Sequence, residues 1–394
     1  MYNFTTIGKR YDVGSAKWEE IHKYLPEEQG DIIPFSVADM ELEIAPEIRE
    51  GLKKYIDNYV LGYARPTKDF LQVVCNWMKK RHNWNIQPEW IVSTPGVVPA
   101  FYGAVNCFTQ PGDGVLLLTP VYYPMSKAIR ANGRQIVESP LINNHGRYEI
   151  DFVDFEKKVQ EPNTKLFILC SPHNPCSRVW SKGELTKMAE ICMENHVLVV
   201  ADEIHSDLIM PGYTHTAYGS LSEAIQNNAI ICTAPSKTFN LAGLQTSNII
   251  IANPKLRQTY KNHMDLHSAV AKCNVLGYEA NRLAYTLCEG WLDQLIEVID
   301  KNRQVIETYL GEKYPEIIIT PLEGTYLMWL DFNALGIPYE ELAQALRLEA
   351  KLFFDDGYIF GKAGEGFERW SLACPTRYIE EALVRLDKML TKKK

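Results

Sequence analysis

The sequence lacks the features of secreted, disulfide-bonded and membrane proteins. Its nine cysteines include no CxxC pair, and their number is odd. This usage indicates reduced thiols in a cytoplasmic protein, with neither a disulfide framework nor a metal site. The N-terminus has no basic segment followed by an apolar stretch, so we expect no secretory signal. No apolar run reaches the roughly 20 residues that span a bilayer, and we expect no membrane partner.

Positive charge is also scarce. The 394 residues include 41 Lys and Arg against 49 Asp and Glu, which gives a net charge of −8. Such a chain has no basic face, so nucleic acid is not expected as a partner. Internal repeats and low-complexity segments are absent, which excludes a repeat architecture. The length, with 46% hydrophobic residues, favours a globular protein of two packed domains.

What the sequence does contain is a regular alternation of apolar strands and helices. The expected strands lie at 90–92, 114–118, 135–137, 166–170, 197–201, 229–232 and 248–252. Uniformly apolar strands of this kind predict an α/β fold with a mainly parallel sheet flanked by helices. The C-terminal part predicts a smaller α+β domain. We expect an N-terminal arm (1–45) that contributes to the small domain, a large domain (46–285) and the small domain (286–394).

Candidate binding residues follow the first of these strands. In such sheets, ligands bind at the carboxyl ends of the strands. Gly96 stands where a loop enters a helix, so amide groups there, including those of Val97 and Val98, suit a phosphate. Tyr122 and Tyr123 follow the next strand.

Later strands end in residues with acid–base chemistry. Asn174 is fixed next to prolines and can donate a hydrogen bond to a phenolic oxygen. Asp202 ends a strand that is apolar throughout, where a carboxyl group has a raised pKa unless it meets a cation such as a pyridinium. Lys237 lies among small and apolar residues, so partial desolvation would lower its pKa and free a neutral amine to attack a carbonyl. Arg369 begins an apolar strand and suits a carboxylate.

In this order, these residues resemble the fold-type I pyridoxal-phosphate (PLP) enzymes of the aminotransferase class I/II superfamily, and the resemblance covers nearly the whole chain. It implies a seven-stranded large-domain sheet. Several stretches look specifically like the MalY/PatB cystathionine β-lyase branch, which includes cystalysin-like C-S lyases. These stretches are 15–18, 36–40, 62–63, 120–124, 171–175, 202–207 and 236–240.

The resemblance implies a pyridoxal 5'-phosphate cofactor held in the large domain. Lys237 would bind it covalently, and Asp202 would pair with the ring nitrogen and keep it protonated. Asn174 would bond the ring hydroxyl oxygen, and Tyr122 would stack on the ring. The phosphate would be bound by Gly96, Val97 and Val98 through backbone amides and by the hydroxyl of Ser236.

Further roles follow from the same resemblance. Tyr63 would reach across a homodimer interface to the phosphate of the partner subunit. Arg369 would bind the substrate α-carboxylate, with Ala38 beside the substrate. Tyr123 would lie near the reacting groups and join Lys237 and Asp202 as a catalytic residue.

Two positions depart from the aspartate aminotransferases within that superfamily. His205 replaces a tyrosine three residues after the aspartate, which fits the C-S lyase branch. It would lie beside the cofactor, and its role stays open. Gln245 stands where those enzymes have a phosphate-binding arginine. The phosphate charge would then be balanced more by the helix N-terminus.

The resemblance implies α,β-elimination from an L-amino acid with a sulfur leaving group, such as L-cystathionine or L-cysteine. The products would be pyruvate, ammonia and a thiol. An aminotransferase of L-amino acids would use the same lysine, aspartate and arginine, so that alternative stays open. A second alternative is a PLP-binding regulatory or interaction protein, against which stands the complete set of candidate catalytic residues.

Overall fold

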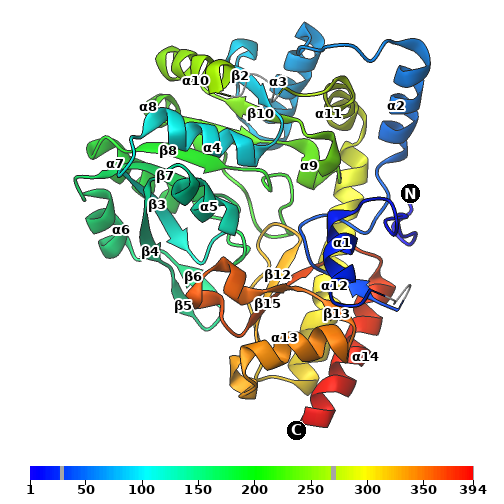
Figure 1. Cartoon of the computed structure of the whole chain (residues 1–394). Helices are drawn as coiled ribbons and strands as arrows, with labels where there is room; N and C mark the ends of the chain where they lie inside the picture. Colours follow the sequence, from blue (N-terminus) through cyan, green and yellow to red (C-terminus); the bar gives the residue numbers. More distant parts are fainter. Residues whose placement is uncertain (27–30, 268–271, 394) are drawn as a thin grey trace.

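The computed structural model describes residues 1–26, 31–267 and 272–393. Its main element is a seven-stranded sheet with the order β2-β10-β9-β8-β7-β3-β4 (Figure 1). The strands are β2 (Ile91–Thr94), β3 (Gly114–Thr119), β4 (Gln135–Pro140), β7 (Thr164–Cys170), β8 (Leu198–Asp202), β9 (Ala229–Thr233) and β10 (Ser247–Ile250). Only β10 runs antiparallel to its neighbours within this sheet. The prediction of a mainly parallel seven-stranded sheet is therefore confirmed.

Both faces of this sheet are buried, which explains why its strands are apolar throughout. Successive residues of a strand point to opposite faces. In β3, Leu117 belongs to the core on one face, which includes Phe101 of α4 and Met125 of α5. Its neighbour Leu116 belongs to the core on the other face. The helices that contribute buried residues to these two cores include α3 (Lys68–His82), α4 (Val97–Phe108), α5 (Tyr123–Ala131), α6 (Phe152–Val159), α7 (Lys182–Glu194), α10 (Pro254–His267) and α11 (Val275–Leu287).

Local signals set several element boundaries as expected. Ser181 caps α7 by accepting a hydrogen bond from the amide of Glu184, whose side chain in turn accepts one from the Ser181 amide. The sequence predicts this capping box, because Glu184 stands three residues after Ser181. The sequence predicts a long helical region from about 256 to 309, and within it Asn274 caps a new helix, α11. Residues 268–271 of that region lie outside the described residues.

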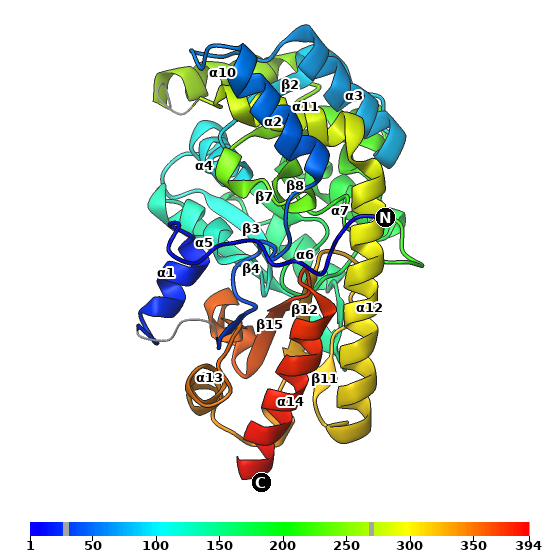
Figure 2. The ribbon, with the colours of Figure 1, turned by 90° about the vertical axis from the view of Figure 1, so that its right-hand side faces the viewer.

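The C-terminal part is built around a second, four-stranded antiparallel sheet with the order β11-β12-β15-β14. Its elements are β11 (Ile318–Ile319), β12 (Leu327–Asp331), α13 (Tyr339–Leu348), β14 (Asp355–Asp356), β15 (Phe367–Ser371) and α14 (Thr376–Lys393). The 25-residue helix α12 (Glu289–Lys313) runs from the large sheet down alongside α14 (Figure 2). None of the helices in the described ranges is long and apolar enough to cross a membrane.

The N-terminal segment packs against the C-terminal part of the chain. It holds α1 (Ala16–His22) and β1 (Ile33–Pro34), followed by α2 (Pro46–Asn58). Strand β1 pairs in parallel with β13 (Leu352–Phe353). This pairing accords with an arm that contributes to the small domain, although the exact domain boundaries stay a prediction.

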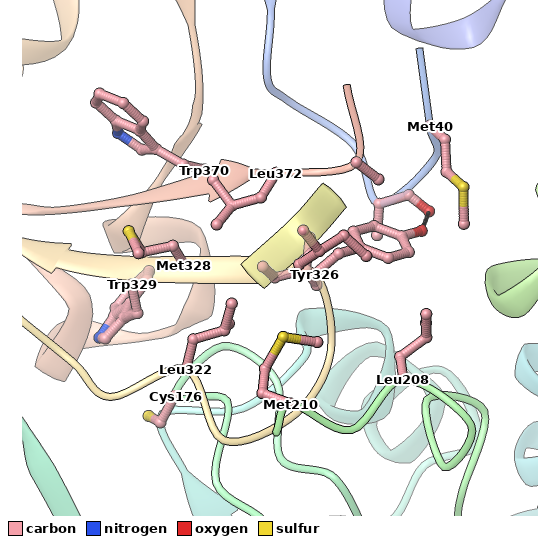
Figure 3. Close-up of a cluster of buried hydrophobic side chains, with 14 of the residues drawn as sticks. Met40, Cys176, Leu208, Met210, Leu322, Tyr326, Met328, Trp329, Trp370 and Leu372 are labelled. Atoms are coloured by element: carbon pink, nitrogen blue, oxygen red, sulfur yellow. Dashed lines mark hydrogen bonds between the residues drawn. The ribbon is translucent and has the colours of Figure 1, made fainter. Parts of the chain in front are cut away.

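A buried cluster connects the two sheets (Figure 3). Leu208 and Met210, which follow β8, lie with Leu322 and Tyr326 near β12 in one core. Backbone hydrogen bonds reinforce the contact: the amide of Met210 donates to Glu323, and that of Thr325 donates to Leu208. The cluster therefore holds the segment after Asp202 against the small sheet.

The packing of α11 on the segment before β10 gives a stability prediction. A methyl group on Gly277 would lie 2.4 Å from the Leu244 carbonyl oxygen and 2.0 Å from Thr246 Oγ1, whereas one on Gly290 would meet no atom within 4 Å. We expect Gly277→Ala to lower the free energy of unfolding by about 1–3 kcal/mol through overpacking. The matched change Gly290→Ala should raise it by up to about 1 kcal/mol through helix propensity.

Chemical denaturation of both variants checks this prediction. Equal changes in the free energy of unfolding of the two variants would contradict it, because they would show that α11 can move away from the segment before β10.

Candidate active site

A cavity of about 330 Å³ opens at the carboxyl ends of the parallel strands. Parallel strands end at a common edge, and this edge brings together residues from the ends of β2, β3, β7, β8 and β9. Ten of the predicted site residues line it: Ala38, Gly96, Val97, Val98, Tyr122, Asn174, Asp202, His205, Ser236 and Lys237. Tyr63, Tyr123 and Arg369 are not among its lining residues.

Lys237 lies in the short helix α9 (Pro235–Thr238), directly after β9. Its Nζ donates a hydrogen bond to the Ala38 carbonyl oxygen at 2.6 Å. Its pKa is lowered to about 8, chiefly by burial and also by the nearby Arg369, while Asp39 and Asp202 act in the opposite direction. A substantial fraction of the amine is therefore neutral near pH 8, as a nucleophile or base requires.

Asp202 is the last residue of β8, and its side chain is buried in the same cavity. Its Oδ1 accepts one hydrogen bond, from the Ile204 amide at 3.2 Å. Burial raises the pKa of this carboxyl to about 7, although the Ile204 amide and Lys237 both lower it. A cation placed against Asp202 would stabilise its charged form.

Arg369 lies on β15 of the small sheet and is buried beside the cavity. Its Nη1 donates to Asn174 Oδ1 at 2.8 Å, and its Nη2 forms an ion pair with Asp355. Its buried Nε has no hydrogen-bond partner among the described residues. The same Asp355 carboxylate accepts the Val37 amide at 3.0 Å, so the guanidinium connects the two sheets and the N-terminal arm.

The first turn of α4 supplies amide groups at the cavity. Gly96 precedes this helix with φ of 138°, a backbone conformation that favours glycine. Thr94 Oγ1 donates a hydrogen bond to the Gly96 carbonyl oxygen at 2.9 Å. The first amides of a helix have no partner within the helix, so Val97 and Val98 can bind an anion there. Tyr122, which follows β3, also lines the cavity, and its amide donates to the Asn174 carbonyl at 3.0 Å.

His205 lines the cavity, and its ring packs edge-on to Tyr326 with a centroid distance of 6.0 Å. Burial lowers the pKa of His205 well below its usual value, and Lys237 and Arg369 lower it further. Its Nδ1 is buried without a hydrogen-bond partner among the described residues. The imidazole is therefore neutral and available to a bound molecule.

Two predicted residues lie apart from this cavity in the single chain. The side chain of Tyr63 is fully exposed in the segment between α2 and α3, and Tyr123 is 47% exposed. The Tyr123 ring lies 5.5 Å from that of Tyr122, so it flanks the site from outside. The roles assigned to these two residues stay predictions.

Sequence reasoning missed several residues that surround the site. Gln245, Thr246 and Ser247 line the cavity because the antiparallel β10 begins at the edge where the parallel strands end. Gln245 was noticed only as the position of a missing arginine. Tyr326 donates from its hydroxyl to the Ala38 carbonyl at 2.8 Å, and Asp355 orients Arg369. No local pattern in the sequence marks either contact.

The residues present fit a pyridoxal-phosphate group. The cavity offers a weakly basic amine for an aldehyde, a buried carboxyl group for a cationic ring nitrogen and helix amides for a phosphate. The unpartnered His205 Nδ1 and Arg369 Nε indicate that polar atoms of a ligand belong here. Within the described residues, no cluster of three or more His, Cys, Asp or Glu could hold a metal ion.

The fold and the site define a protein of the aminotransferase type. Residues 30–386 match the family "Aminotransferase class I and II", and the chain belongs to this family.

Its relatives include carbon–sulfur lyases. Cystathionine beta-lyase PatB of Bacillus subtilis (strain 168) is 39% identical over 99% of this chain and 100% of that protein. The structure of cystalysin from Treponema denticola, which contains a pyridoxal 5'-phosphate cofactor, has a TM-score of 0.98 and 46% identity over 100% of both chains. The PLP-bound C-S lyase of Staphylococcus hominis has a TM-score of 0.91 and 31% identity over 99% of this chain and 98% of that one.

The buried Asp202 gives a prediction about pH. Its folded-state pKa, about 7, lies above the value near 3.9 of an unfolded chain. Between these values the folded protein holds a proton that the unfolded chain has released, so stability falls as pH rises from about 4 to 7. Asp202→Asn removes this titration. We expect the cofactor-free variant to be more stable than the cofactor-free wild type at pH 8, with a smaller gain at pH 5.

Urea denaturation of both proteins at the two pH values measures this difference. A gain that is the same at pH 5 and pH 8 would contradict the raised pKa.

Proposed function

We propose that this chain is a pyridoxal-phosphate-dependent carbon–sulfur β-lyase that acts on L-cystathionine or L-cysteine-type amino acids. The observation that carries the proposal is the convergence of the Lys237 amine and the Asp202 carboxyl in one cavity, with the Arg369 guanidinium beside it. Among the reactions of the family, this one is supported by the relatives that are named as lyases.

Several residues would hold the cofactor. Lys237 would bind it covalently, Asp202 would face its ring nitrogen and Tyr122 would lie against its ring. Asn174 would bond its hydroxyl oxygen, with His205 nearby. The phosphate would lie at the start of α4, at Gly96, Val97 and Val98, with the hydroxyl of Ser236. When bound, this cofactor withdraws the electrons left on Cα after loss of its proton.

The chain's own side chains supply the proton transfer and the orientation. Arg369 would bind the substrate α-carboxylate, and its contact with Asn174 sets where that carboxylate lies relative to the cavity. Lys237 Nζ would accept the Cα proton, since its lowered pKa leaves it neutral and its bond to the Ala38 carbonyl fixes its direction. The Cβ–S bond then breaks, and the sulfur leaves with the bonding electrons as a thiolate.

Water is the remaining reactant. Hydrolysis of the remaining three-carbon fragment gives pyruvate and ammonia, and protonation of the thiolate gives the thiol. Ala38 and Tyr123 would lie on the substrate side, where Tyr123 flanks Tyr122. An aminotransferase would use the same lysine, aspartate and arginine, and it would require a keto acid as the second substrate.

We also propose that two chains form a homodimer. The segment after α2 exposes Tyr59, Val60, Leu61 and Tyr63, with exposed fractions between 55% and 112%. A contiguous apolar stretch of this kind is typical of an interaction surface, and Tyr63 would then reach the phosphate of the partner subunit. Sedimentation velocity should give about twice the 45.0 kDa of one chain, and a monomer at micromolar concentration would contradict the proposal.

A cytoplasmic location is proposed on the state of the thiols. All nine cysteines are free and eight of them are buried, as is usual in a reducing compartment. The proposed substrate is a small sulfur-containing amino acid, and neither nucleic acid nor a membrane surface is proposed as a partner.

The lyase assignment is tested by pyruvate formation. Purified holoenzyme should release pyruvate from L-cystathionine without any added keto acid. Lys237→Ala should lose both this activity and the visible absorbance of the bound cofactor, whereas Arg369→Ala should chiefly raise KM, by tenfold or more, because the carboxylate loses its partner.

Two outcomes would contradict the assignment. Strict dependence on a keto acid, with alanine formed from pyruvate, would assign the chain to the aminotransferases. Tight binding of a protein partner without turnover of any thioether amino acid would favour the regulatory alternative.

A further inference from the structure

A second, larger hollow flanks the active site. It has a volume of about 870 Å³, against about 330 Å³ for the cavity that holds Lys237. One wall is the face of α5 with Tyr123, Lys127 and Arg130, which are spaced one helical turn apart. The facing wall is formed by residues 358–363, and Glu138 of β4 also lines the hollow. We call this hollow the distal groove.

The distal groove carries charge that the fold does not neutralise. Three of its lining residues are cations, Lys127, Arg130 and Lys362, and one is an anion, Glu138. In the described part of the chain, none of these four side chains forms a salt bridge or a hydrogen bond. The groove therefore offers an excess of positive charge together with one carboxylate, which is the complement of an amino acid zwitterion.

The groove adjoins the candidate active site, and two contacts between side chains link the two hollows. Tyr123 lines the groove, and its ring lies 5.5 Å from that of Tyr122, which lines the inner cavity. On the facing wall, Phe360 lines the groove while the Arg369 guanidinium lies over its ring at 4.7 Å. These contacts place the groove next to Arg369, so the leaving group of a substrate whose α-carboxylate lies at Arg369 would reach the groove past Phe360 and Tyr123.

We propose that the distal groove binds a leaving group that is itself an amino acid, as in L-cystathionine. Lys127, Arg130 and Lys362 bind its distal carboxylate, and Glu138 binds its distal ammonium group. This inference rests on the proposed lyase function and specifies its substrate class: thioethers that carry a second α-amino acid group are preferred over simple S-alkyl cysteines. Tyr123 and Phe360 supply the apolar walls for the methylene groups.

The test compares two substrates that differ only beyond the sulfur atom. With purified holoenzyme, Lys127→Ala combined with Arg130→Ala should lower kcat/KM for L-cystathionine about tenfold, chiefly through KM, because the carboxylate loses two partners. The same variant should change kcat/KM for S-methyl-L-cysteine less than twofold. Arg130→Lys should retain most of the activity toward L-cystathionine, since it keeps the charge. Lys388→Ala, on the outer helix α14, is the matched control for removal of an exposed cation.

Two further readouts do not depend on the chemical step. For the wild type, KM for L-cystathionine should rise with ionic strength while KM for S-methyl-L-cysteine stays constant, because salt screens exposed charges. Calorimetric titration of the cofactor-free protein with L-cystathionine should show weaker binding in the double variant than in the wild type.

The outcomes separate the two proposals. If both substrates give pyruvate and the double variant loses activity equally on both, or on neither, the distal groove does not select the leaving group and the inference is wrong. If the wild type gives pyruvate from neither substrate, the lyase function itself fails, and the inference fails with it.

Discussion

An amine and a carboxyl group buried within one cavity form the constraint on which the site depends. Within the described part of the chain, neither Lys237 nor Asp202 forms a direct ion pair, and desolvation moves their pKa values toward one another, to about 8 and about 7. The fold tolerates this because Asp202 ends β8 and Lys237 lies in the short helix α9 that follows β9, two strands that are buried along their length, so neither backbone can move into solvent. Burial of these two groups lowers the stability of the protein in the absence of a ligand. The protein regains this stability when it binds a ligand whose charged groups pair with them.

The N-terminal arm connects this buried pair to the small sheet. The Ala38 carbonyl accepts hydrogen bonds from Lys237 Nζ and from the Tyr326 hydroxyl. Its neighbour Asp39 forms ion pairs with Arg10 and with the fully buried Lys17. Burial alone would raise the pKa of Asp39, but Lys17 and Arg10 hold it below its usual value. The charged Asp39 carboxylate raises the pKa of Lys237 and so limits how far burial lowers it, while Lys17 of the same arm acts in the opposite direction.

The sequence was informative where a single strand end determines the position of a residue. Asp202 ends one apolar strand and Asn174 follows another, and parallel packing brings such ends to one edge whatever the strand order is. The sequence was less informative where position depends on pairing between distant segments. The apolar run that forms β10 does not reveal that it is antiparallel, so Thr246 and Ser247 could not be placed at the cavity. The contact of Asp355 with Arg369 depends on the pairing of two short strands, which has no local signature.

The same reasoning explains why the two hollows differ. The inner cavity is bounded by strand ends and helix starts whose backbones are fixed by the sheet, so its size and polar groups are set by the fold. The distal groove lies between the exposed face of α5 and the short 3-10 turns of residues 357–364. Its four charged side chains are exposed, so they can change without disturbing either core. The residues that carry out the chemistry common to the family therefore lie at the sheet edge. Choice of the leaving group belongs to the surface next to it, where the structure permits variation at little cost in stability.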